Sequence, residues 1–373
     1  MSGTSGISGM LTAKQVQFLR EELATAKNPL FFYDDDGDGL ASFLLLYRMH
    51  REGTGVRVAT SSKIDVRALR KVSELNPDKI FILDIPLLEQ EFVDQAKRPI
   101  FWIDHHQPQE MRNVHYFNPR IKEPDAYIPT TQWAYQISAN KDDLWIAATG
   151  CLADAYIPEF LDDFIKKYPD LLPEKSDLAT MLYRQPLGKL VKMFFLLLKG
   201  PNSEVKKSVK ILSRIKSPYE IFKRGSAPGK FLYHRFDRIN EMYENVLSDA
   251  RKKATRSSLL LFTYPSTKWS FTAVLANELL ALHPNKIILI ARKKSDEMKC
   301  SLRAGFRIVD ALEKALQGVE GYGGGHANAC GAVIKEKDWE LFLRKFKEEI
   351  KKEEIKKEEI KKEEIKKGEI KSL

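Results

Sequence analysis

The sequence predicts an α/β protein with two domains joined by a long helix. Short apolar runs alternate with helical periodicity in the first third of the chain, as in PLFFY at 29–33 and KIFIL at 79–83, and such alternation is typical of a parallel sheet. A charged amphipathic stretch at 231–256 predicts the joining helix, and strand-like runs resume after it. With 373 residues the chain is too long for one ordinary hydrophobic core, which also favours two domains.

The first domain is expected over residues 12–230, after a Gly/Ser-rich leader at 1–11 that we expect to be disordered. Further apolar runs, VRVAT at 56–60 and PIFWI at 99–103, extend the predicted sheet, with helices between them. Because several runs are apolar throughout, the sheet is expected to be covered on both faces. From about 128 to 225 the pattern becomes helical, so a helical part should complete this domain.

The second domain is expected over residues 257–349 and should be the smaller of the two. The runs SLLLFTY, KIILIAR and KCSLRA predict its strands. The chain ends in a charged tail at 350–373 that repeats KKEEI. Its Ile residues recur every five positions, which spreads them around a helix, so we expect a solvated helix, with a docking segment as the alternative.

Composition and charge limit the classes of function. The formal net charge of +10 suits a polyanionic partner, although a generally basic proteome explains it equally well. Three cysteines without a CxxC motif favour a reducing compartment and argue against a disulfide framework or a thiolate zinc site. No apolar run approaches the roughly 20 residues that span a bilayer, and the first residues lack the pattern of a signal peptide. We therefore expect a cytoplasmic protein with no membrane partner.

Acidic residues and histidines follow three of the predicted strands. The motif DDDGDG follows the first and supplies Asp34, Asp36 and Asp38, and Asp84 follows the strand at 79–83. The run at 99–103 leads into Asp104, His105 and His106. The carboxyl ends of parallel strands meet at one edge of a sheet, so these side chains should converge there. Asp154, in the small-residue helix ATGCLADAY, can add a carboxylate from the helical part.

A cluster of about five carboxylates repels itself and raises its own pKa values. Two divalent cations would remove most of this cost, and mixed carboxylate and imidazole ligands suit Mn²⁺, with Mg²⁺, Co²⁺ or Zn²⁺ as alternatives. Two neighbouring ions are also the usual arrangement for hydrolysing phosphate esters. Each part has a simpler interpretation, because an Asp-rich turn is often a solvated loop and Asp84 could cap a helix. An EF-hand is excluded because Leu45 stands at the twelfth loop position, where a bidentate Glu is required.

These ordered motifs resemble those of the DHH phosphoesterase superfamily. Its name-giving motif corresponds to residues 104–106, and its first motif, H-x-D-x-D-G, corresponds to residues 34–39. Asp84 and Asp154 correspond to its second and fourth motifs. The chain departs from the family at Asp34, where the first motif has His. A carboxylate can replace imidazole on a hard metal, and the change should favour Mn²⁺ or Mg²⁺.

The resemblance implies a role for each of these residues. Asp34 and Asp36 would hold one metal ion, with Asp84 bridging to a second. The second ion would be held by Asp38, His105 and Asp154. Asp104 would orient a histidine ring by a hydrogen bond, and His106 would face the phosphate that is cleaved. The catalytic residues implied are Asp84, Asp104 and His106.

The second domain carries a resemblance of its own. GYGGGHANACGA is similar to the GGGH motif of the DHHA1 domain, and KCSLRA is similar to its S-x-R strand. Glycines expose backbone N–H groups to a phosphate, and Arg offers a two-pronged donor. Taken alone, the three glycines could equally form a hairpin turn. The substrate-binding residues implied are Ser301, Arg303, Gly323, Gly324, Gly325 and His326, across a cleft from the metals.

Within the superfamily the resemblance favours a RecJ-like exonuclease of the compact archaeal kind. It would hydrolyse single-stranded DNA or RNA to mononucleotides. The sequence leaves open which of the two is preferred and the polarity, for which the resemblance favours 3′→5′. It would act in DNA repair or replication beside a helicase or replisome protein, while the oligomeric state stays open. Lysines and an arginine of the second domain are candidate backbone contacts, although solvated side chains explain them as well: Lys293, Lys294, Lys299 and Arg307. Two alternatives remain, a nanoRNase- or pAp-phosphatase-like oligonucleotide hydrolase and a non-catalytic replisome scaffold.

Overall fold

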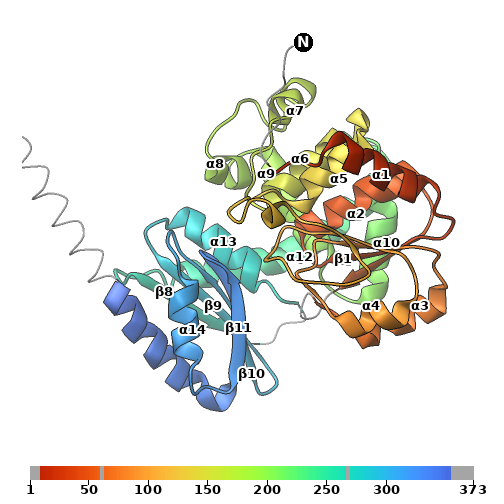
Figure 1. Cartoon of the computed structure of the whole chain (residues 1–373). Coiled ribbons are helices and arrows are strands. Elements are labelled where there is room, and N and C mark those ends of the chain that lie inside the picture. Colours follow the sequence, from red (N-terminus) through yellow and green to blue (C-terminus); the bar gives the residue numbers. More distant parts are fainter. Residues whose placement is uncertain (1–8, 59–62, 266–268, 354–373) are drawn as a thin grey trace, which may run out of the picture. The chain divides into compact units, whose positions relative to one another are not determined.

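The computed structural model describes residues 9–58, 63–265 and 269–353 (Figure 1). The chain divides into two compact units, Met1–Ile239 and Asn240–Leu373. The predicted fold class is confirmed, because the first unit contains a parallel sheet between helices and the second contains another sheet in a smaller domain. In the described residues no helix combines the length and apolarity needed to cross a membrane.

The first sheet has five parallel strands in the order β2-β1-β4-β6-β7. Three of its strands, β1, β4 and β6, come from apolar runs and are almost completely buried. The edge strand β7 was not predicted, because its three residues HYF are too few and too exposed to form an apolar run. The strands are β1 (Leu30–Asp34), β2 (Thr54–Val58), β4 (Ile80–Leu83), β6 (Ile100–Ile103) and β7 (His115–Phe117).

Helices cover both faces of this sheet (Figure 1). On one face lie α1 (Ala13–Ala24) and α2 (Gly37–His50), where Phe43 of α2 stacks on Tyr33 with ring centroids 4.7 Å apart. On the other lie α3 (Leu69–Leu75) and α4 (Gln90–Ala96), which share a core cluster with the alternate side chains of the strands. The sheet is therefore buried on both sides, as its apolar strands predict. A small parallel pair, β3 (Lys63–Ile64) and β5 (Leu87–Leu88), and η1 (Val66–Ala68) lie in the connections.

The helical part of the first unit packs on α2. Gly150 of α6 allows a close approach, because a Cβ there would lie 2.3 Å from both Ala41 Cβ and Thr131 Oγ1. Small residues at such a contact let two helix backbones come together. This places the end of α6 beside the beginning of α2. The elements are η2 (Pro119–Ile121), α5 (Thr130–Ser138), η3 (Lys141–Asp143), α6 (Leu144–Ala153), α7 (Leu161–Lys167), α8 (Leu178–Tyr183), α9 (Pro186–Leu197), α10 (Asn202–Leu212) and α11 (Pro218–Phe222).

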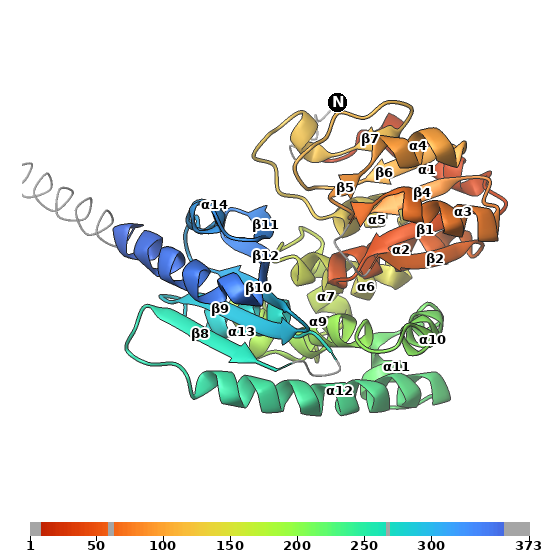
Figure 2. The ribbon, with the colours of Figure 1, turned by 90° about the horizontal axis from the view of Figure 1, so that it is seen from below.

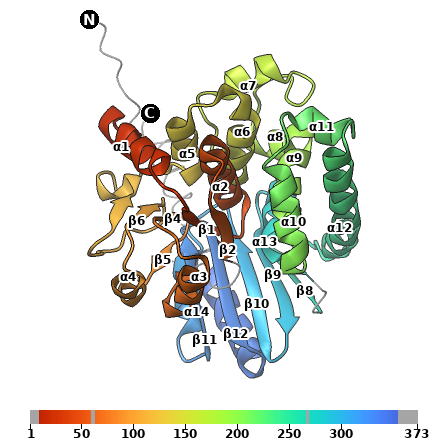
Figure 3. The same ribbon diagram turned by 90° about the vertical axis from the view of Figure 1, so that its right-hand side faces the viewer.

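The predicted joining helix corresponds to α12 (Ala227–Arg251), which begins in the first unit and ends in the second (Figure 2). The predicted boundaries on either side of this helix stay predictions. The second sheet has the order β11-β12-β10-β9-β8 (Figure 3), and all its pairs are antiparallel except β8 with β9. The strands are β8 (Leu259–Tyr264), β9 (Ile287–Lys294), β10 (Glu297–Arg303), β11 (Gly321–His326) and β12 (Ala329–Lys335).

The two faces of the second sheet are covered by different helices. Alternate residues of β10, such as Cys300 and Leu302, share a core cluster with α14 (Val309–Leu316) and a final helix described over residues 339–353. The other residues of β10 face α13 (Thr272–Leu282), as shown by the hydrogen bond between Ser301 and Thr272. η4 (Glu336–Asp338) leads into the final helix. The register of β10 therefore decides which side chains enter the core.

Two predictions at the ends of the chain need correction. The disordered leader was predicted to extend to residue 11, but Leu11 is buried and its N–H and C=O bond the side chain of Gln136 at 3.2 and 2.8 Å. The solvated tail was predicted to begin at Ile350, but that side chain belongs to the core of the second unit and is 4% exposed. The composition of each segment as a whole gave no indication that the apolar residue at its border, Leu11 or Ile350, would be buried. Residues 1–8 and 354–373 lie outside the described residues.

Candidate metal centre

The turn from β1 into α2 gathers the carboxylates of the DDDGDG motif. Asp34 is the last residue of β1, and Asp36 caps α2 by accepting the N–H of Gly39 at 2.9 Å. A Cβ on Gly39 would lie 2.7 Å from the backbone nitrogen of Asp34, so glycine is required for this close turn. Asp38 follows within the first turn of α2. The turn thus holds the three carboxylates at the carboxyl edge of the sheet.

Asp38 is held by the beginning of α5. Its side chain is 1% exposed, and its two oxygens accept the backbone N–H groups of Thr130 at 2.9 Å and Thr131 at 2.6 Å. The first N–H groups of a helix lack partners within the helix and favour a negative charge. We did not predict these two residues, although Pro129 directly before a helical pattern is a signal for a helix N-terminus.

Asp84 occupies a strained position directly after β4. Its φ of 59° is in the left-handed region, which costs a non-glycine residue about 1–2 kcal/mol. The backbone is fixed there by its N–H, which donates to the carbonyl of Ile103 at 2.9 Å. The side chain is 1% exposed, and Thr130 Oγ1 donates to its Oδ1 at 3.4 Å. The fold therefore maintains both strain and burial at this carboxylate.

His105 brings the separate motifs together. Its Nε2 lies 3.2 Å from Asp84 Oδ1, 3.6 Å from Asp154 Oδ2 and 3.9 Å from Asp38 Oδ2. Asp154 is the C-cap of α6, so the close packing of that helix on α2 delivers a carboxylate from the helical part. Carboxylates from two strand exits and one helix end therefore converge on a single imidazole, which itself follows a third strand.

Two sets of potential ligands result. Asp38, His105 and Asp154 each offer an atom within 4.8 Å of the others. The second set, defined by the same distance, is Asp34, Asp36 and Asp84. Both sets have the composition of the ligand groups implied by the resemblance, while ligation itself stays a prediction. Carboxylate oxygens with one imidazole fit Mn²⁺ or Mg²⁺.

The electrostatics of the cluster also fit cations. Burial, with the nearby charge of Asp154, raises the pKa of Asp38 to about 6. Burial and the charges of Asp38 and Asp36 raise the pKa of Asp84 well above its ordinary value. Burial lowers the pKa of His105, which keeps the ring neutral and able to coordinate a metal. Divalent ions would favour the ionised carboxylates that the protein alone disfavours.

Asp104 orients His106 rather than His105. Its Oδ1 lies 2.7 Å from the ring nitrogen Nδ1 of His106, and its Oδ2 accepts the backbone N–H of His106 at 3.0 Å. Asn118 donates to the same Oδ2 at 3.2 Å and to the His106 carbonyl at 2.9 Å. Burial alone would lower the pKa of His106. The hydrogen bond and the charge of Asp104 outweigh this effect, so that the pKa is raised to about 9. In the metal-free protein this favours the protonated ring at neutral pH. No sequence signal pointed to Asn118.

The three residues predicted to be catalytic lie close together. Asp84, Asp104 and His106 offer side-chain atoms within 4.8 Å of one another. Asp35, which the prediction left out of the site, instead forms ion pairs with Arg57 at 2.7 Å and Lys199 at 3.3 Å. It anchors the motif to β2 and to the end of α9.

In the second unit, strand register aligns the predicted substrate-binding residues. Through β12, Ser301 lies in one row with Gly324, and Arg303 lies in the next row with His326. Residues opposite one another in antiparallel strands project to the same face. Between them β12 contributes only the small residues Gly331 and Ala329. The motif thus forms a band of small residues bordered by polar side chains on one face of the sheet.

Hydrogen bonds within the unit fix two of these side chains. Ser301 is buried and donates to Thr272 Oγ1 at 3.0 Å. Arg303 donates from Nε to Asn277 Oδ1 at 2.6 Å, and from Nη1 to the carbonyls of Leu302 and Cys330 at 2.8 and 3.2 Å. Both contacts with α13 lie on the face that carries the aligned rows. The guanidinium is therefore positioned before any ligand arrives.

The three glycines form part of the edge strand β11 and not a loop. A Cβ on Gly324 would meet no atom within 4 Å, so the space above its Cα is open. Gly325 differs, because its φ is 140° and a Cβ would lie 2.6 Å from the carbonyl oxygen of Ala329.

Three of the four side chains predicted to contact the nucleic-acid backbone have acidic partners in the described residues. The pairs are Lys293 with Glu336, Lys299 with Glu297 and Arg307 with Asp310.

Comparison with known families supports this assignment of motifs. A model of the DHH family N-terminal domain matches residues 30–155, and a model of the DHHA1 domain matches residues 259–352. The chain belongs to the DHH/DHHA1 superfamily. The first match contains the candidate metal centre, and the second contains the aligned rows of β10, β12 and β11. Comparison with curated proteins found no match.

Several solved structures share the fold of this DHH/DHHA1 protein at low identity. RecJ from Thermus thermophilus, crystallised with Mn²⁺, is 14% identical with a TM-score of 0.65, over 89% of this chain and 53% of that one. An exonuclease RecJ bound to manganese is 14% identical with a TM-score of 0.55, over 90% and 94%. A DHH domain described as that of a member of the s1p family of ribosomal proteins is 13% identical with a TM-score of 0.67, over 93% and 94%. This chain thus spans about half the length of the Thermus RecJ.

Proposed function

We propose that this DHH/DHHA1 protein is a metal-dependent phosphodiesterase that degrades single-stranded nucleic acid from one end. The observation that carries the proposal is the pair of neighbouring ligand sets, joined by the 3.2 Å approach of Asp84 to His105. The RecJ-like fold and the basic composition support a nucleic-acid substrate. A role in DNA repair or replication completes the proposal by analogy with RecJ-like enzymes, and 3′→5′ polarity by analogy with the compact archaeal ones.

The residues of the centre divide the chemical work. Two divalent ions bound here would activate a water molecule and stabilise the charge of the reacting phosphate. Asp38, His105 and Asp154 would hold one ion, and Asp34 and Asp36 the other, with Asp84 between them. The two backbone N–H groups that bond Asp38 would hold this ligand in position in advance. A site assembled before the substrate binds needs no reorganisation during the reaction.

His106 would act on the substrate directly. Asp104 keeps its ring oriented and protonated, and the side chain is 24% exposed, so it can reach a ligand. A protonated imidazole beside a phosphate donates a hydrogen bond and neutralises charge. In the second unit, Arg303, His326 and the open backbone at Gly324 would hold further phosphates of the strand.

Degradation of end-labelled strands tests the proposal. The full chain is incubated with single-stranded DNA or RNA labelled at the 5′ or the 3′ end, with Mn²⁺, with Mg²⁺ or with EDTA. We expect mononucleotide release that requires Mn²⁺ or Mg²⁺, and its loss in Asp84→Ala and His105→Ala. The matched control is Asp162→Ala, which removes an exposed carboxylate from α7.

The products also separate the alternatives. Hydrolysis of only the shortest oligonucleotides would favour a nanoRNase-like activity over the proposed exonuclease. An absence of hydrolysis with either metal, in protein shown to be folded, would overturn the proposal and favour a non-catalytic scaffold.

A further inference from the structure

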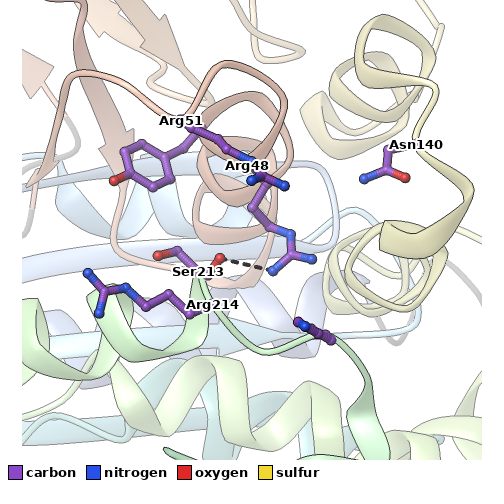
Figure 4. A pocket seen from close by; sticks show the side chains of 7 residues that line it. Arg48, Arg51, Asn140, Ser213 and Arg214 are labelled. Carbon is purple, nitrogen blue, oxygen red and sulfur yellow. Dashed lines mark hydrogen bonds between the residues drawn. The ribbon is translucent and has the colours of Figure 1, made fainter.

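A cavity lies in the first unit at the opposite end of α2 from Asp36 and Asp38. Its volume is about 400 Å³. Figure 4 shows Arg48 and Arg51 at the end of α2, Ser213 and Arg214 after α10, and Asn140 between α5 and η3. We call this cavity the α2–α10 pocket. Its lining residues are Tyr47, Arg48, Arg51, Asn140, Ser213, Arg214 and Lys216.

Arg48 is the structural cation of the α2–α10 pocket. Its Nε and Nη2 lie 2.7 and 2.6 Å from Asp143 Oδ1, and Asp143 is completely buried. Its Nη1 donates to the carbonyl of Ser213 at 2.9 Å (Figure 4) and to that of Ile215 at 2.7 Å. One arginine therefore neutralises the buried acid and also satisfies the carbonyl groups after α10. The charge of the other lining cations is not needed for either task.

Three cations remain at the pocket without a carboxylate partner among the contacts of the described residues: Arg51, Arg214 and Lys216. All three are exposed. Glu220 is the acidic residue nearest to Lys216 in the sequence. Its two oxygens accept the backbone N–H of Lys216 at 2.7 Å and the hydroxyl of Ser226 at 3.0 Å. Cations near helix C-termini can stabilise the helix dipole by a few tenths of a kcal/mol each. That role does not require three of them around one cavity.

We propose that the α2–α10 pocket binds the phosphate group of a nucleotide. Arg51 and Arg214 each supply a planar, two-pronged donor, and Lys216 supplies a third positive charge. The volume lies in the range of small-ligand sites. The half-buried ring of Tyr47 and the amide of Asn140 provide an apolar surface and hydrogen-bonding groups for the rest of the ligand. The pocket is separate from the metal centre, so the proposal does not depend on hydrolysis.

The source of the phosphate is either a free nucleotide or a single strand, and titration of the full chain distinguishes them. Inorganic phosphate, AMP and a short oligothymidylate are titrated by calorimetry at low salt in EDTA, which leaves the metal centre without ions. We expect binding that weakens about tenfold or more in Arg214→Ala/Lys216→Ala, because two charge-assisted contacts are lost. The matched control, Lys206→Ala/Lys230→Ala, removes two exposed charges from α10 and α12 and should bind like the wild type.

Each outcome decides a part of the proposal. Loss of AMP binding in the pocket variant identifies a free nucleotide as ligand, and loss of oligonucleotide binding alone identifies a strand. A parallel titration of Arg303→Ala, which should keep the pocket's share of binding, separates it from the predicted binders of the second unit. The proposal is overturned if the pocket and control variants bind equally. It is also overturned if the wild type binds none of the probes at about 10 mM, which is about the weakest affinity of interest. Failure of nuclease activity leaves this test intact, since no metal is present in it.

Discussion

The two units present the residues of their family motifs in opposite ways. In the first, carboxylates of four separate segments lie close together, with those of Asp38, Asp84 and Asp104 buried, and Asp84 is held in a strained backbone conformation. In the second, the residues of the GGGH motif lie along an edge strand, where space is open above Gly324. The first arrangement concentrates negative charge at a cost in stability, while the second leaves an accessible strip of backbone with small side chains. The difference is expected if the first unit holds ions and the second holds a strand.

The largest effect should come from the centre of the first unit. Asp84→Asn removes the charge that lies between the two ligand sets, and we expect nuclease activity to fall about 10³-fold. At the same time the metal-free protein should melt at the same or a higher temperature, because a buried, repelled carboxylate is replaced by a neutral amide. Activity assays and thermal unfolding measure the two effects. A variant that keeps most of its activity would contradict the bridging role of Asp84.

Adjacent glycines of the second unit should respond very differently to the same substitution. Gly325→Ala forces a Cβ to within 2.6 Å of the Ala329 carbonyl at a φ of 140°, and should destabilise the unit by about 1–3 kcal/mol. Gly324→Ala places its methyl group in open space and should change stability by less than about 0.5 kcal/mol. Chemical denaturation gives both values. If Gly324→Ala keeps stability but weakens strand binding, the open space at this position is used by the substrate.

A smaller effect is expected from Arg303→Lys. The substitution keeps the positive charge but loses the planar guanidinium that Asn277 and two carbonyls hold in place. We expect KM for single strands to rise about tenfold with little change in kcat, since the residue binds phosphate away from the reacting bond. Steady-state kinetics separate the two parameters. An effect confined to kcat would move Arg303 from strand binding to the chemical step.

The smallest and most gradual effect concerns pH. The pKa of Asp38 is raised to about 6 from an ordinary value of 3.8, so the folded protein favours its protonated form. Without metal, the stability contribution of Asp38 is therefore highest at low pH and is lost as pH rises through about 6. Mn²⁺ competes with this proton, so the rise in melting temperature on adding Mn²⁺ should be small at pH 5 and full at pH 7. An increase that is equal at both values would exclude Asp38 as a ligand.

Part of this architecture follows directly from local sequence. The apolar runs predict β1, β4 and β6, because a sheet covered on both faces needs apolar residues at every position. The acidic residues at the ends of these runs then converge by topology alone, since all parallel strands end at one edge. The sequence therefore determined the parallel sheet and the location of the strand-exit carboxylates.

Other features were decided only by tertiary packing. The backbone donors of Thr130 and Thr131 reach Asp38 because α5 begins beside α2, and no local pattern specifies that neighbour. Asp154 joins the cluster because Gly150 lets α6 approach α2, and Arg303 lines up with His326 because β12 sets the register between their strands. A strand or helix records its own periodicity in its residues. The partner that it meets depends on how the whole chain packs, and this contact completes both candidate sites.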